Sequence, residues 1–136
     1  VEAAIRGETV LMGSAYFMKK RRVALPRVFG REMRFFYVTD RCQLVTGAYG
    51  IPEPADGCQE ADAPKALVIT PGVGFSKDGN RIGYGAGYYD RFFAAEPDHM
   101  AVGLCYGFQL FPAFETEKHD KKMAYIVTPE QTIKVL

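Results

Sequence analysis

A glycine-rich segment, Gly83-Tyr-Gly-Ala-Gly87, is followed directly by Tyr88-Tyr-Asp-Arg91. Glycines at alternate positions allow the backbone to adopt positive φ repeatedly and to turn several amide N–H groups toward one point, as in an anion-binding nest. A helix that begins near Gly87 would add unpaired N–H groups and a partial positive charge, which also favour phosphate. Arg81 would add a charge-assisted contact from the rim. The pattern indicates an anion site, although a flexible turn would carry the same glycines.

The spacing of this segment does not support two familiar nucleotide-binding patterns. Its glycines follow G-x-G-x-G, without the G-x-G-x-x-G spacing of the dinucleotide fold and without the Lys-Ser/Thr that ends a Walker A loop. Asp90 falls in the first turn of the predicted helix, where a carboxylate stabilises the helix dipole. A carboxylate beside a bound phosphate also repels it unless Mg²⁺ bridges the two groups. The spacing alone leaves a dipole role and a metal role for Asp90 equally open.

The elements on either side of this segment would hold it in place. Residues 66–70 form an apolar run that Pro71-Gly72 ends, which is typical of a buried strand. Two i,i+4 aromatic pairs within residues 88–93 predict a helix that ends near Pro97. The long connection between strand and helix leaves the carboxyl end of a strand, where open α/β sheets place their ligands.

The rest of the chain predicts further strands and an α/β fold. Val10, Leu11, Ala15 and Met18 have the spacing of a short amphipathic helix, and residues 47–64 have the composition of a surface loop. Strands separated by helical or loop segments predict a three-layer α/β/α sandwich with a largely parallel, Rossmann-like sheet. The further predicted strands are residues 23–25 (ended by Pro26), 33–38, 100–105, 123–127 and 132–136.

Size and composition limit the possible functions. With 136 residues, 48% hydrophobic and 24% charged, the chain resembles one soluble globular domain. Its formal charge of +1 provides no global field that would recruit nucleic acid or a membrane surface. Cys42, Cys58 and Cys105 are odd in number and widely spaced, which disfavours a zinc site or a disulfide framework. We expect a cytoplasmic monomer that binds small molecules, without nucleic-acid or membrane partners.

The segment from Pro71 to Arg91 resembles the 5-formyltetrahydrofolate cyclo-ligases, also called methenyltetrahydrofolate synthetases. The family pattern is Pro-Gly-Val-x-Phe-Asp-x-x-Gly-x-Arg-x-Gly-x-Gly-x-Gly-Tyr-Tyr-Asp-Arg, and the chain matches nearly every fixed position. Ser76 departs from it where the family usually has Asp, and Ala86 departs where glycine or lysine is common. Weaker similarities follow in the family's order: Arg22-Val-Ala-Leu-Pro-Arg27, Met33 with Phe35, Gly50-Ile-Pro-Glu-Pro54, Gln109 and His119-Asp120.

The resemblance implies a three-layer α/β fold and a reaction in which ATP drives closure of 5-formyltetrahydrofolate to 5,10-methenyltetrahydrofolate, giving ADP and phosphate. In that reaction the formyl oxygen is phosphorylated, N10 attacks the activated carbon and phosphate departs. Carried over by position, the residues around the ATP phosphates would be Arg81, Ile82, Gly83, Tyr84, Gly85, Ala86, Gly87, Tyr88 and Tyr89. Those bordering the folate would be Tyr84, Gly85, Ala86, Gly87 and Tyr88.

The resemblance also implies Mg²⁺ as a cofactor beside ATP, with Asp90 and Asp120 as its ligands. From the residues alone, Asp120 is an exposed acid in the charged run 115–122, and the resemblance is what favours a metal role. His119 receives no role from either line of reasoning.

Family members usually carry a further amino-terminal region, with a basic helix that helps to hold ATP phosphates, and residues 1–17 do not match it. We therefore expect residues 1–136 to form a single cyclo-ligase-like α/β domain in which this part is missing or divergent. Our first hypothesis is an active cyclo-ligase. The alternatives are a non-catalytic member that binds nucleotide or folate as an interaction module, and a structural α/β domain whose glycine loop is merely flexible.

Overall fold

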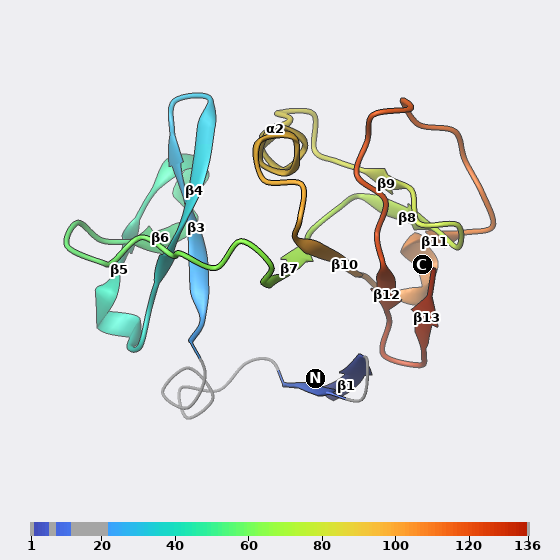
Figure 1. Ribbon diagram of the computed structural model, residues 1–136, viewed down its shortest axis with the longest axis horizontal. Coiled ribbons are helices and arrows are strands. Elements are labelled where there is room, and N and C mark those ends of the chain that lie inside the picture. The colour runs from blue at the N-terminus through green and yellow to red at the C-terminus, as the bar shows by residue number, and fades with distance from the viewer. Residues whose placement is uncertain (1, 6–7, 12–21, 136) are drawn as a thin grey trace. The chain divides into compact units, whose positions relative to one another are not determined.

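The computed structural model contains one α-helix, short 3-10 helices and several sheets among the residues that it describes, which confirms the predicted α/β class (Figure 1). No helix in this part of the chain has the length and apolar character needed to cross a membrane. The described residues are 2–5, 8–11 and 22–135. Contacts within the chain divide it into two compact units, of which the first comprises Val1–Val10 with Pro64–Leu136 and the second comprises Leu11–Ala63.

The first unit is built around a four-stranded sheet. In spatial order its strands are β13 (Thr132–Lys134), β12 (Tyr125–Val127), β10 (Met100–Leu104) and β7 (Leu67–Thr70). β10 is parallel to both of its neighbours, whereas β13 is antiparallel to β12. The predicted apolar runs form these strands, and Val102 lies opposite Ile69 and Tyr125 in the core. Because parallel strands need a long crossover, the connection from β7 to β10 has room for a site.

This connection contains a hairpin where the sequence predicted only a loop. Its strands are β8 (Gly74–Ser76) and β9 (Arg81–Ile82), which are antiparallel, and β11 (Leu110–Phe111) pairs with β8 in parallel. In the turn of the hairpin, the Asn80 side chain donates a hydrogen bond to the Phe114 carbonyl at 2.6 Å. Local patterns missed the hairpin because contacts distant in sequence hold it.

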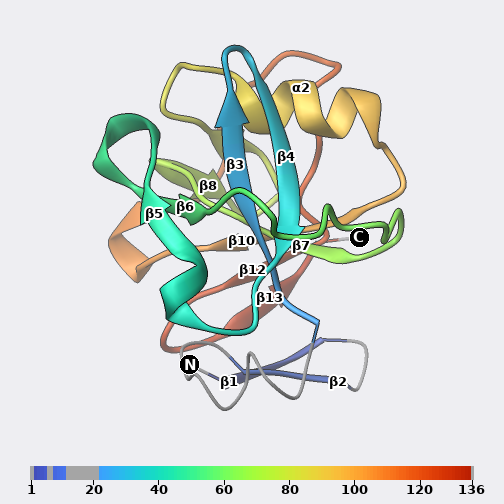
Figure 2. The same ribbon diagram turned by 90° about the vertical axis from the view of Figure 1, so that its left-hand side faces the viewer.

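The predicted helix is confirmed as α2 (Tyr88–Ala95). Figures 1 and 2 both place α2 on one side of the four-stranded sheet. Phe92 and Phe93 are buried, and the Phe92 ring stacks on His99 with centroids 5.1 Å apart. The Nε2 atom of His99 lies 2.9 Å from the Glu96 carboxylate, just beyond the end of the helix. Phe92 and Phe93, the second members of the two predicted aromatic pairs, therefore pack inward.

The described residues of the second unit form two antiparallel hairpins and two short 3-10 helices. The first hairpin joins β3 (Ala24–Phe29) to β4 (Glu32–Tyr37), and the second joins β5 (Leu44–Thr46) to β6 (Pro52–Pro54). The 3-10 helices are η1 (Arg41–Gln43) and η2 (Ala48–Gly50). Because β6 falls within residues 47–64, the prediction that this stretch is a loop is wrong there.

Two further predictions about the amino-terminal half are also wrong. A strand was expected to end at Pro26, yet β3 continues through it, because β3 pairs along one side only and tolerates a residue without an N–H group. Val10 and Leu11 lie on strand β2 (Glu8–Leu11), which pairs with β1 (Glu2–Ile5), and not on an amphipathic helix. Ala15 and Met18, which completed that helical pattern, lie outside the described residues.

Candidate functional site

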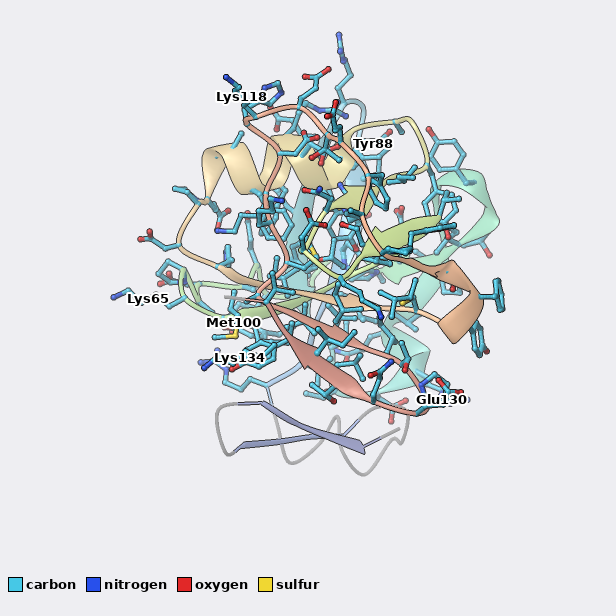
Figure 3. The ribbon with its side chains drawn as sticks, turned by 90° about the vertical axis from the view of Figure 1, so that its right-hand side faces the viewer. Lys65, Tyr88, Met100, Lys118, Glu130 and Lys134 are labelled. Atoms are coloured by element: carbon cyan, nitrogen blue, oxygen red, sulfur yellow. The ribbon has the colours of Figure 1, made fainter. Side chains whose placement is uncertain are left out.

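The glycine-rich segment forms an exposed loop that leads from β9 into α2. Gly85 and Gly87 have positive φ of 95° and 69°, as expected for glycines that turn the backbone. The amide N–H groups of residues 83–87 donate no hydrogen bond to another described residue. In Figure 3, Tyr88 lies at the top of the view beside α2, and Glu130, which follows β12, lies at the bottom. The connection that contains the loop begins directly after β7 ends at Thr70, so it leaves the carboxyl end of a strand, as predicted.

Arg81 lies beneath this loop, whereas the sequence placed it at the rim. Its side chain is only 7% exposed. One guanidinium nitrogen, Nη2, lies 2.5 Å from Oδ1 of Asp90, and Nη1 donates to the Pro71 carbonyl at 3.2 Å. A Cβ atom on Gly83 would lie 2.9 Å from Nη1. The absence of a side chain at Gly83 therefore allows the guanidinium to approach the backbone closely. Positive φ was predicted for all three alternating glycines and is confirmed only for Gly85 and Gly87.

The two predicted metal ligands are both near α2 but do not contact each other. Asp90 is in the first turn, with its side chain 43% exposed and one oxygen engaged by Arg81. Asp120 closes a turn, in which its Oδ2 accepts a hydrogen bond from the Glu117 amide at 3.2 Å. The next residue, Lys121, donates to the Pro97 carbonyl at 2.5 Å, which holds this turn against the end of the helix. No cluster of three or more potential metal ligands occurs among the described residues.

The three tyrosines of the segment differ in exposure. Tyr84 is 75% exposed at the loop. Tyr88 is half-buried, and its ring lies 5.1 Å from the guanidinium carbon of Arg91. The Tyr89 ring packs on Phe93 with centroids 6.4 Å apart, and burial raises the pKa of its hydroxyl to about 12, against the opposing effect of the nearby Arg81 charge. This division fits the expectation that one of the adjacent tyrosines packs inward and the other borders the loop.

The pKa of Tyr89 leads to a prediction about alkaline stability. Between about pH 10 and 12 the folded protein keeps this proton while an unfolded tyrosine has lost it, so the free energy of unfolding falls as the pH rises through this range. We expect Tyr89→Phe to remove up to about 2 kcal/mol of this loss, measured by denaturant unfolding at pH 8.5 and 11.5. The control Tyr84→Phe should leave the decrease in unfolding free energy between the two pH values unchanged. A decrease in Tyr89→Phe as large as in the native protein would show that Tyr89 does not cause it.

The structure explains how Ser76 is accommodated where the family usually has Asp. Ser76 is fully buried, and its hydroxyl donates to Oδ1 of Asp78 and accepts from the Asn80 amide at 3.0 Å. The hydroxyl also lowers the pKa of Asp78, and Lys122 contributes in the same direction. An aspartate at position 76 would place a second carboxylate against Asp78. Ser76 therefore supports the hairpin turn beneath the loop and needs no charge to do so.

His119 forms an exposed ion pair on the surface. Its Nε2 lies 3.0 Å from Oε2 of Glu117, and both side chains are largely exposed. Exposed pairs of this kind contribute little to stability. The structure therefore gives His119 no part in the candidate site.

Glu53, in the second unit, is a candidate that the sequence reasoning did not single out. It lies on β6 and is 7% exposed. A Cβ atom on Gly47 would lie 2.2 Å from Cδ of Glu53, so the side chain is packed against the backbone there. Glutamate side chains are rarely this buried, which makes Glu53 a candidate within the second unit. The only sequence signal was its place in the Gly50-Ile-Pro-Glu-Pro54 similarity.

Curated relatives share one description. The chain is 27% identical to the probable 5-formyltetrahydrofolate cyclo-ligase of Schizosaccharomyces pombe over 87% of this chain and 66% of the relative. It is 38% identical to the Saccharomyces cerevisiae 5-formyltetrahydrofolate cyclo-ligase over 64% of this chain and 44% of the relative. With the Mus musculus protein of that description it is 33% identical over 56% of this chain and 42% of the relative. The chain thus spans less than two thirds of the length of these relatives.

Two solved structures of 5,10-methenyltetrahydrofolate synthetases are also similar to this chain. The NMR structure of Aquifex aeolicus 5,10-methenyltetrahydrofolate synthetase matches with a TM-score of 0.76 and 31% identity, covering 88% of this chain and 61% of that one. The Mycoplasma pneumoniae 5,10-methenyltetrahydrofolate synthetase matches with a TM-score of 0.54 and 23% identity over 85% of this chain and 57% of that one, which supports the fold. Because the model of the 5-formyltetrahydrofolate cyclo-ligase family matches residues 4–129, the chain belongs to this family.

Proposed function

We propose that the protein catalyses the ATP- and Mg²⁺-dependent cyclisation of 5-formyltetrahydrofolate to 5,10-methenyltetrahydrofolate, with release of ADP and phosphate. The observation that carries this proposal is the exposed loop of residues 83–87, whose amide N–H groups are unpaired among the described residues and lead into the amino terminus of α2. Such amides and a helix amino terminus together favour phosphate oxygens. Family membership supports the folate substrate.

In this proposal the loop positions the ATP phosphates. Phosphoryl transfer depends mainly on positioning and on neutralising charge, and backbone amides supply both without mobile side chains. Arg81 contributes positive charge from beneath the loop, where its contacts with Asp90 and Pro71 fix the guanidinium. The proposed phosphate-binding residues remain Arg81, Ile82, Gly83, Tyr84, Gly85, Ala86, Gly87, Tyr88 and Tyr89.

The carboxylates fit a magnesium ion that also binds phosphate. Mg²⁺ is usually held by one or two carboxylates together with substrate phosphates and waters, so a cluster of three protein ligands is not required. Asp90 is partly exposed beside the loop, and Arg81 engages only Oδ1 of its two oxygens. We assign Asp90 and Asp120 as the residues that would hold the ion. When bound, Mg²⁺ would neutralise negative charge on the transferred phosphoryl group.

The folate is proposed to lie along the outer side of the loop. Tyr84 presents an exposed aromatic ring there, which suits stacking on a flat heteroaromatic group. The backbone has free space beside it at Gly85, where no atom outside the neighbouring residues lies within 4 Å of an added Cβ. The proposed folate-binding residues are Tyr84, Gly85, Ala86, Gly87 and Tyr88.

The test is to mix the purified protein with ATP, Mg²⁺ and 5-formyltetrahydrofolate and to follow the absorbance of the methenyl product. We expect product that requires all three additions. Ligand binding in calorimetry without turnover would identify the non-catalytic alternative. A folded protein that neither turns over nor binds ATP or the folate would leave only a structural domain.

We also propose several broader features of the protein from its sequence and its family membership. The described residues contain one α-helix, and we propose the three-layer arrangement from family membership. Parallel pairing joins β7, β10 and β12 in the main sheet, and β8 with β11. We further propose that the chain forms a single domain, is a monomer in the cytoplasm and has no nucleic-acid or membrane partners.

A further inference from the structure

Arg91 is held against the glycine loop by three contacts that the proposed function leaves unexplained. Its Nη2 donates a hydrogen bond to the Ala86 carbonyl at 2.9 Å. Its guanidinium carbon lies 5.1 Å from the centre of the Tyr88 ring. A Cβ atom on Gly87 would lie 2.8 Å from Nη1. One side chain therefore contacts three consecutive residues at the point where the loop becomes α2.

The hydrogen bond to Ala86 fixes the direction of one peptide plane. The described peptide bonds are all trans, and a trans peptide points its C=O and N–H groups in opposite directions. When the Ala86 carbonyl turns toward Arg91, the N–H of Gly87 must therefore turn away from Arg91. That N–H is one of the unpaired loop donors, and Gly87 itself has a positive φ of 69°.

We propose that Arg91 is a positioning residue that orients the Gly87 N–H for a phosphate group by holding the Ala86 carbonyl on the opposite side. This inference rests on the proposed function, since it assigns a role within the same loop. Without the guanidinium, the Ala86–Gly87 peptide plane can rotate, and part of the binding free energy is then needed to order it. The close approach at Gly87 makes this glycine and Arg91 a coupled pair.

The test measures ADP binding by isothermal titration calorimetry together with the KM for ATP. We expect Arg91→Met to weaken ADP binding roughly tenfold and to raise the KM for ATP by a similar factor, as for loss of one hydrogen bond with a charged donor. The ADP affinity of Arg91→Lys should lie between those of the native protein and Arg91→Met, because lysine keeps the positive charge but lacks the planar guanidinium. Arg34→Met is the matched control, since Arg34 lies 4.2 Å over the Phe29 ring in the second unit and should bind ADP normally. Circular dichroism and melting curves confirm that each variant is folded.

A double-mutant cycle separates positioning from direct phosphate binding. Gly87→Ala should weaken ADP binding in the native background, both through its left-handed φ and through its contact with the guanidinium. In Arg91→Met the contact is gone, so the further loss should be clearly smaller. Additive losses would overturn positioning and make Arg91 an independent ligand. Normal ADP binding by Arg91→Met would also overturn the inference but leave the proposed function intact, whereas no ADP binding by the native protein would overturn both.

Discussion

Asp90→Asn is expected to lower turnover at saturating ATP by about 100-fold or more while the protein stays folded. Asparagine keeps the size of the side chain but offers only a weak neutral ligand to Mg²⁺. A metal that stabilises transition-state charge is worth several kcal/mol, and about 3 kcal/mol corresponds to the expected factor. The measurement is the rate of methenyl product formation at several Mg²⁺ concentrations. The dependence on Mg²⁺ should shift to higher concentrations in the variant.

The same substitution also disturbs Arg81, so stability has to be measured beside activity. The Arg81 guanidinium is almost fully buried, and in the variant it would face a neutral amide oxygen at position 90 beside the Pro71 carbonyl. Removing one partner of a buried pair is strongly destabilising, but Asp90 is 43% exposed and its oxygens are partly screened by water. We expect a loss of about 1–2 kcal/mol, which leaves the protein folded.

Two further variants separate the metal role from the ion pair. Asp56→Asn removes the partner of Arg27, 2.7 Å away in the second unit, and controls for the loss of an arginine–aspartate pair. It should lower stability slightly and leave turnover unchanged. Arg81→Met with Asp90 kept should retain binding of Mg²⁺ together with ATP, though weakened. If Asp90→Asn binds ATP with the native dependence on Mg²⁺, the carboxylate is a helix-dipole and ion-pair residue and holds no metal.

The features that sequence reasoning predicted well are those with a local physical cause. The aromatic pairs at i,i+4 predicted α2, and the apolar runs predicted β7 and β10, because periodicity and composition report directly on burial. Positive φ at Gly85 and Gly87 follows in the same way from the freedom of a residue without a Cβ atom. The strand before the candidate site and the helix and strand after it were therefore predictable from residues 66–104 alone.

What could not be predicted depends on neighbours that are distant in the sequence. The close approach that Gly83 permits involves a guanidinium whose course is set by Pro71 and Asp90. The hairpin of β8 and β9 depends on Asn80, whose side chain bonds to the Phe114 carbonyl, and on pairing with β11. Neither contact leaves a periodic signal. A loop prediction was reasonable from the turn residues, but it missed the framework that holds the loop.

The link between this hairpin and the main sheet is the side chain of Phe75. It is fully buried on β8. Cβ atoms placed on Gly72 and Gly103 would lie 2.9 Å and 2.5 Å from its ring, so the ring lies directly on the backbone on both sides. Because Gly103 belongs to β10, the ring fixes the position of β8 and β9 relative to the central strand. The glycine loop, which continues from β9, takes its position from this contact.

Phe75→Ala should therefore have the largest effect on stability of any substitution discussed. Truncation of a buried phenylalanine costs about 3–5 kcal/mol, a large part of the 5–15 kcal/mol typical of a domain, and should lower the melting temperature by roughly 10 °C or more. Phe75→Leu should cost only about 1–2 kcal/mol. Phe108→Ala, at a ring that is 80% exposed, is the matched control and should change stability by less than about 0.5 kcal/mol.

The glycine partner makes the Phe75 prediction specific. Gly103→Ala alone places a methyl group 2.5 Å from the ring and should be strongly destabilising. In the Phe75→Leu background the planar ring is absent, so Gly103→Ala should cost at least about 1 kcal/mol less than it does alone, as expected for residues in contact. Denaturant unfolding of the four proteins measures this coupling. Strict additivity would show that the ring does not anchor the hairpin on β10, and the loop would then need another support.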